Sequence, residues 1–158
     1  GFGKKGGETY SAFAQNYAQE IGLNGNISIQ RVGGGELEGG YVRGIYDPKT
    51  NSYRMEPTVY VKGGAAKLTE YQVQQVVQHE LTHLKQVQDG RLGMAKIDGV
   101  LYKTWEGKPY ISNNAFARIM NGFNSRSNSV RQQSYKQYRE LPWEVDAHNA
   151  GDPFKDTQ

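Results

Sequence analysis

Val76-Val77-Gln78-His79-Glu80-Leu81-Thr82-His83-Leu84 is the stretch on which the interpretation of this chain depends. Residues four apart on a helix lie on one face, so His79 and His83 can hold one metal ion between them. Neutral imidazole nitrogens suit zinc, and Glu80 lies beside the first histidine, where a carboxylate can act as general base on a water molecule. The alternative is a pair of ordinary histidines on an amphipathic helix.

The helix that carries this stretch has recognisable ends. Thr69 followed by Gln72 has the form of a capping box, and Asp89-Gly90 marks the other end. The H-E-x-x-H spacing is the motif of zinc-dependent hydrolases, and its neighbours are uncharged apart from Lys85. Apolar residues at helical spacing form one stripe, with the histidines along its margin: Val73, Val76, Val77, Leu81, Leu84 and Val87.

Composition limits the class of protein. A chain of 158 residues fits one domain, and its lack of cysteine excludes disulfides, thiol catalysis and cysteine-based zinc fingers. No run is apolar enough to span a membrane, so we expect no membrane partner. The net charge of +3 is too small to imply nucleic acid by itself. The chain begins at Gly1 without a signal-peptide segment, and its cellular location stays open.

The pattern along the chain predicts an α+β fold, with a flexible tail over residues 1–7 and a single domain over residues 8–158. A small antiparallel or mixed sheet would pack against an N-terminal helix and the motif helix, with further helices at the C-terminus. The N-terminal helix would start at Thr9 and end at Gly22. We expect strands at residues 26–32, 41–46 and 53–61. The last two would form a hairpin, and Thr58 to Val61 would be an edge or near-edge strand.

The C-terminal segment supplies candidates for a third metal ligand. A zinc site built on two helical histidines needs one more protein ligand, and its fourth position stays open for water. The third histidine, His148, follows Glu144 and Asp146 closely. Pro142 fits the first turn of a helix, which would place Glu144 and His148 on one face. Zinc accepts both oxygen and nitrogen ligands, so chemistry alone does not choose between the carboxylates and His148. The alternative for the whole segment is a surface helix held down by Trp143.

Three segments carry a resemblance to a known family. They are His79 to Gln86, then Trp105 to Tyr110, which resembles a W-x-G-K-x-Y hairpin, and Leu141 to Ala147, which matches a P-W-E-x-[ED]-A pattern. With these segments, Thr58 to Ala150 resembles a minimal gluzincin-type HEXXH zinc metallopeptidase domain. The chain is similar to small phage- and prophage-encoded metallopeptidase-like proteins, and more distantly to SprT-like and ImmA/IrrE-like domains.

The resemblance implies a zinc-dependent metalloendopeptidase with a zincin-like fold. It implies that His79, His83 and Glu144 bind Zn²⁺. Glu80 would then be the general base for a metal-bound water that attacks a peptide bond in a protein or peptide substrate.

The sequence leaves the roles of several residues near the site open. Asp146 is the alternative third ligand. His148 would support the ligands, donate to the transition state or itself be the third ligand. Tyr135 and Tyr138 are further candidates for stabilising the oxyanion. The strand at residues 58–61 would hold an extended substrate by main-chain pairing.

Two rival functions come from other classes. One is a catalytically weak or inactive zinc-binding structural component of a phage particle or similar assembly. The other is nucleic-acid binding, for which a solvated basic face is the favoured alternative. The sequence does not specify the substrate or the oligomeric state. The hypothesis of nucleic-acid binding depends on a run of basic residues: Arg118, Arg126, Arg131, Lys136 and Arg139.

Overall fold

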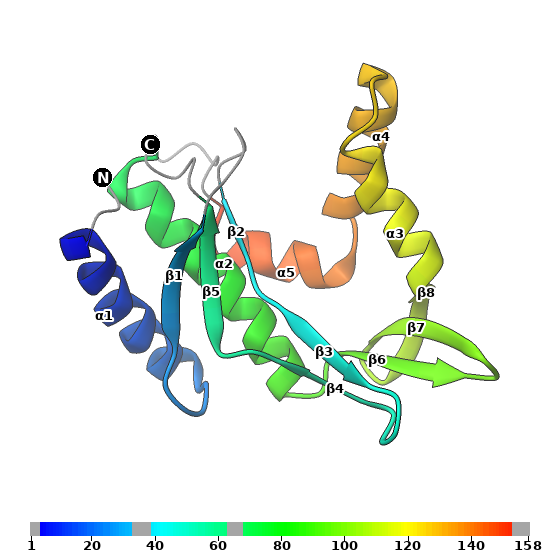
Figure 1. The fold of residues 1–158 in the computed structure, drawn as a ribbon, viewed down its shortest axis with the longest axis horizontal. Helices are drawn as coiled ribbons and strands as arrows, with labels where there is room; N and C mark the ends of the chain where they lie inside the picture. Colours follow the sequence, from blue (N-terminus) through cyan, green and yellow to red (C-terminus); the bar gives the residue numbers. More distant parts are fainter. Residues whose placement is uncertain (1–3, 33–38, 63–67, 153–158) are drawn as a thin grey trace.

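The computed structural model describes residues 4–32, 39–62 and 68–152, and it has an α+β fold (Figure 1). The helices are α1 (Lys4–Ile21), α2 (Glu70–Gln88), α3 (Asn113–Gly122), α4 (Asn128–Arg139) and α5 (Pro142–Ala150). The strands are β1 (Ser28–Val32), β2 (Gly40–Tyr41), β3 (Gly44–Asp47), β4 (Ser52–Met55), β5 (Thr58–Lys62), β6 (Leu92–Ile97), β7 (Val100–Trp105) and β8 (Lys108–Ser112). Within the described ranges, none of the helices is long and apolar enough to cross a membrane.

Strand β5 is the central strand of a small mixed sheet. It pairs in parallel with β1 on one side and antiparallel with β2 on the other, where Tyr41 lies opposite Tyr60. Of the two expected positions for the strand at residues 58–61, the edge position is wrong and the near-edge position is the one found, so a substrate cannot pair along this strand as expected. Tyr60 explains the error: its position suggested a solvated face, but Tyr41 stacks on its ring at 5.0 Å and Arg43 lies 4.4 Å from the ring centroid.

The main core lies between this sheet and the helices α1 and α2. Val59 and Val61 of β5 belong to one buried cluster with apolar residues of both helices. Ala14 and Ala18 are fully buried, and their small side chains allow α1 to approach closely. Gly22 ends α1 with φ of 82°, a conformation that glycine adopts without strain.

The N-terminal part of the chain differs from expectation in two ways. Helix α1 begins at Lys4 rather than Thr9, so part of the expected tail is helical, and residues 1–3 lie outside the described ranges. Two of the expected strands are each divided. One break falls at Glu56-Pro57, because proline lacks the N–H that a sheet needs. The hairpin around residues 47–51 is confirmed as β3 and β4.

A second sheet and three helices complete the fold. Strand β7 lies between β6 and β8, all antiparallel. The expected hairpin at Trp105 to Tyr110 is confirmed, and it turns at Glu106 and Gly107, which both have positive φ as a two-residue turn requires. Figure 1 shows α3 and α4 side by side, extending away from the sheets, and α5 returning to α2.

Candidate metal centre

Helix α2 presents the H-E-x-x-H residues from a well-anchored position. The capping box is confirmed: the Thr69 backbone N–H donates to Gln72 Oε1 at 2.9 Å, and the Gln72 backbone N–H donates to Thr69 Oγ1 at 3.1 Å. The other end is also as expected, with Asp89 at the C-cap. The apolar face of the helix enters the core, and His79 and His83 are buried at 7% and 6% exposure on the side that meets α5.

The start of helix α5 is anchored by a buried tryptophan that packs on β7, β8 and α3. Pro142 is in the first turn, as its fixed φ favours. Trp143 is 3% exposed, and its ring centroid lies 6.2, 5.6 and 6.4 Å from those of Trp105, Tyr110 and Phe116. The next residue, Glu144, therefore starts from a backbone position that packing holds in place.

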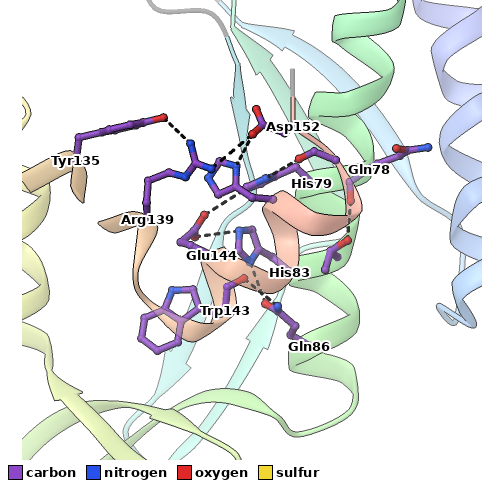
Figure 2. A network of polar contacts seen from close by, with 12 residues as sticks. Gln78, His79, His83, Gln86, Tyr135, Arg139, Trp143, Glu144 and Asp152 are labelled. Atoms are coloured by element: carbon purple, nitrogen blue, oxygen red, sulfur yellow. Dashed lines mark hydrogen bonds and ion pairs between the residues drawn. The ribbon is translucent and has the colours of Figure 1, made fainter. Parts of the chain in front are cut away.

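Glu144 reaches between the two motif histidines. Its Oε1 lies 3.1 Å from Nε2 of His79, and its Oε2 lies 3.1 Å from Nε2 of His83 (Figure 2). The residue is 3% exposed, so water does not screen these contacts. The structure thus places the Glu144 carboxylate in contact with both motif histidines, between α2 and α5.

The outer nitrogen of each ring is fixed by a carbonyl oxygen. Nδ1 of His79 lies 3.1 Å from the backbone oxygen of Gly151. Nδ1 of His83 lies 3.0 Å from Oε1 of Gln86, and the amide nitrogen of Gln86 donates to the Trp143 backbone oxygen at 3.0 Å. Carbonyl oxygens only accept hydrogen bonds, so both Nδ1 atoms carry the proton and donate it. Such outer contacts orient metal-binding imidazoles in many proteins.

This arrangement requires positive charge between the rings and the carboxylate. With Nδ1 protonated, each Nε2 lone pair would face a carboxylate oxygen unless a proton or a cation lies between them. A tetrahedral zinc ion with bonds of about 2.0–2.2 Å separates neighbouring ligand atoms by about 3.3–3.6 Å. The contacts of Glu144 with His79 and His83, both 3.1 Å, are close to that separation. The types of donor and these two separations are therefore compatible with a metal ion such as zinc.

In the absence of an ion, His83 and Glu144 shift each other's pKa in opposite directions. Burial alone would raise the pKa of Glu144, but His83 and His79 lower it well below its usual range. Burial alone would lower the pKa of His83, but the adjacent Glu144 carboxylate raises it to about 9. Burial raises the pKa of Glu80 against the opposing influence of the two histidines. Without an ion, Glu144 therefore stays ionised and the His83 imidazole beside it carries a positive charge at neutral pH.

His148 extends the group of donors. It lies one turn after Glu144 on α5, as expected, and its ring centroid is 4.5 Å from that of His79. Neither ring nitrogen has a hydrogen-bond partner among the described residues, and Nδ1 is 3.7 Å from Oδ2 of Asp152. Burial, with His79 and Arg139 nearby, lowers the pKa of His148 to about 4. A neutral ring is the form that binds metals.

One atom from each of His79, Glu144 and His148 lies within 4.8 Å of the others, so this group could hold a metal ion. The sequence predicts a different group, His79, His83 and Glu144, so His148 stands in place of His83 in the group that the structure forms. In the structure, His83 contacts the same carboxylate through its second oxygen. The donors around the site therefore comprise three imidazoles and one carboxylate.

The sequence also predicts Asp146 as an alternative ligand and two tyrosines as oxyanion donors, and the structure places them differently relative to the site. Asp146 forms an ion pair with Arg91 at 3.1 Å and its side chain is 39% exposed, so it lies away from the histidines. Tyr138 lies inside: burial first, then the charges of Glu144 and Glu80, raise its pKa well above 10. Tyr135 lies outside, 50% exposed.

Gln86 and Gly151 were not identified from the sequence. Gly151 allows the C-terminus of α5 to approach α2, because a Cβ atom there would lie 2.5 Å from the Gln75 backbone oxygen and 2.9 Å from Gln78 Cβ. The signal for Gln86 was its place three residues after His83, on the same helix face. The signal for Gly151 was its place directly after α5.

No protein-family model matches the chain, and comparisons with curated proteins and with solved structures found no match. The family resemblance of the sequence therefore stays a prediction, and we infer the function from the residues of the site.

Proposed function

We propose that this protein is a zinc-dependent metallopeptidase of the gluzincin type. The observation that carries the proposal is the position of Glu144, whose two oxygens each face an Nε2 atom while both Nδ1 atoms donate to carbonyl oxygens. A donor set of imidazole nitrogens and a carboxylate is typical of catalytic zinc. His79, His83 and Glu144 would hold the ion.

The remaining groups would supply proton transfer and oxyanion stabilisation. Zinc, when bound, would polarise a peptide carbonyl and lower the pKa of water. The Glu80 carboxylate would accept a proton from the attacking water and deliver it to the leaving amine. Glu80 is 9% exposed, which limits competing exchange with solvent. The Tyr138 hydroxyl stays protonated at neutral pH and can donate a hydrogen bond to the developing oxyanion.

An extended substrate would pair with β2 instead of β5. Strand β2 ends the order β1-β5-β2, so one of its sides is an edge of the described sheet. It also borders the motif helix, because a Cβ atom at Gly40 would lie 3.0 Å from Val76 Cγ1. A peptide added there would run beside α2 and its histidines.

The direct test compares Glu80→Gln with the parent. The variant should keep stoichiometric zinc and lose hydrolysis of an unfolded protein by at least about 100-fold, as expected for the loss of a general base. Glu70→Gln is the matched control, because it makes the same change at an exposed position on the same helix. A parent protein that binds no zinc, or a Glu80→Gln variant that cleaves as fast as the parent, would contradict the proposal.

A structural zinc site is the second candidate function. The observation that favours it is His148, whose unpartnered ring could complete a closed set of four protein donors. Closed tetrahedral sites stabilise folds and leave no position for substrate. A protein of this kind would suit a component of a phage particle or similar assembly. Zinc that stabilises the parent strongly, with no chelator-sensitive cleavage of unfolded protein, would favour this candidate.

A further inference from the structure

Lys103 is a cation that lacks an acidic partner in a largely aromatic environment. It lies in β7, half-buried, with Nζ 4.5 Å from the ring centroid of Phe116 and 5.9 Å from that of Tyr53. Among the residues that the structure describes, no carboxylate lies within ion-pair distance of Nζ and no hydrogen bond forms with it.

Two other partly buried cations, Lys85 and Arg91, do have acidic partners. Lys85 pairs with Asp89 at 3.0 Å, and Arg91 pairs with Glu106 and with Asp146. Burial lowers the pKa of Lys103, which shows that the surroundings do not compensate its charge fully. Contacts with ring faces offset only part of the lost hydration of an ammonium group.

Lys103 is close to the metal centre through two packed rings. Phe116, which lies under its ammonium group, is 6.4 Å from Trp143, the residue before Glu144. Glu144 is also the acid whose negative charge raises the pKa of Lys103, against the effect of burial. A divalent cation held by Glu144 would cancel that negative charge, and Lys103 would then be an uncompensated positive charge beside the site.

We propose that Lys103 binds a carboxylate of the peptide substrate and makes the site selective for acidic peptides. The inference rests on the proposed peptidase function and deepens it. An ammonium group that is half-buried and unpaired gains more from a carboxylate than a fully solvated lysine does. The carboxylate could belong to an acidic side chain near the cleaved bond or to the C-terminus of the peptide, and the experiment separates these sources.

The experiment uses zinc-loaded full-length protein and matched peptides. Cleavage sites in an unfolded protein are first mapped by mass spectrometry. Peptides around a mapped site are then made with glutamate, glutamine or lysine at each flanking position, and with a free or an amidated C-terminus. The proteins compared are the parent, Lys103→Met, Lys103→Glu and Lys108→Met, in which an exposed lysine of β8 serves as the matched control.

The parent should prefer one carboxylate-bearing peptide over its neutral partner by about tenfold in kcat/KM, mainly through KM, because the contact forms on binding. A preference for glutamate assigns an internal acidic side chain, and a preference for the free acid assigns the C-terminus. Lys103→Met should reduce the ratio to within about twofold of unity, and Lys103→Glu should favour lysine-containing peptides. Lys108→Met should keep the parent's ratio.

A binding measurement tests the same contact without turnover. Calorimetric titration of the zinc-loaded protein with glutarate and with butyrate compares the same carbon chain with and without a second carboxylate. Glutarate should bind about tenfold more tightly to the parent, and Lys103→Met should remove the difference. Equal binding of both acids to the parent, or an acidic preference that Lys103→Met leaves unchanged in either assay, would overturn the inference.

The outcomes also separate the two proposals. Zinc binding and cleavage without any acidic preference would overturn only the role of Lys103. A protein that binds no zinc would overturn the proposed function and the inference together. If zinc binds and no peptide is cleaved, the glutarate and butyrate titration decides the role of Lys103 by itself.

Discussion

The backbone oxygen of Gly151 lies 3.1 Å from Nδ1 of His79, and this contact joins residues 72 positions apart in the sequence. It fixes the C-terminus of α5 on the motif helix and selects the ring tautomer that directs Nε2 toward Glu144. The proposed metal binding and the packing of α5 would therefore depend on the same contact.

Replacing Gly151 with alanine should weaken both. The added Cβ would lie 2.5 Å from the Gln75 backbone oxygen, so α5 must move and the contact with His79 must lengthen. We expect zinc affinity to fall by about 10–100-fold, the range for loss of a ligand's outer partner. The measurement is a competitive zinc titration. Gly99→Ala is the control: its φ of +83° makes it destabilising, but it lies in a hairpin turn far from the site, and zinc affinity should not change.

Glu144→Gln should remove zinc binding, and Asp146→Asn should not. The first change removes the charge shared by the two histidines and should lower zinc affinity by more than about 100-fold, beyond the loss expected for an outer partner. The second removes a partly exposed ion pair with Arg91, which contributes at most about 1 kcal/mol to stability. Elemental analysis of the purified variants is the measurement. Zinc lost from Asp146→Asn but kept by Glu144→Gln would reassign the ligand.

Trp143→Ala should destabilise the whole C-terminal part of the site. The ring is 3% exposed and contacts three other aromatic side chains, so truncation leaves a large cavity and should cost about 3–5 kcal/mol in the free energy of unfolding. Denaturant unfolding of the zinc-loaded protein measures this cost. Tyr135→Ala, at a residue with 50% exposure, should change stability by less than about 0.5 kcal/mol.

Lys103→Met should stabilise the protein near neutral pH, and the gain should shrink in alkaline solution. Burial lowers the pKa of Lys103 below 10.5, so the unfolded chain binds this proton more readily than the folded one. The folded state is therefore penalised below the folded pKa, and the penalty disappears as the pH rises through that value toward 10.5. Unfolding of the parent and the variant at several pH values checks this. A gain that grows with pH would contradict it.

Local signals in the sequence predicted the elements that position the site. Thr69 with Gln72, and Pro142 with Trp143, act within a few residues, and the helices begin where these residues indicate. The face shared by Glu144 and His148 follows from helix geometry alone. For these reasons, the group of donors could be anticipated without a structure.

Long-range pairing could not be predicted in the same way. Alternation in β5 does not show which strands flank it, and the Tyr60 ring is covered by Tyr41 and Arg43, which are distant in the sequence. The role of Gly151 depends on how closely α5 approaches α2. The position of Lys103 over Phe116 depends on the packing of β7 against α3. These features arise from contacts between elements, which residue spacing does not encode.

The most direct test is calorimetric titration of metal-free protein with zinc, in buffers that differ in ionisation enthalpy. The Glu144 carboxylate raises the pKa of His83 to about 9, and Nδ1 of this ring already donates to Gln86, so an ion bound at Nε2 of His83 must replace a proton there. The account predicts one zinc per chain with release of about one or more protons near neutral pH. Absence of binding, or binding without proton release, would contradict the site described here.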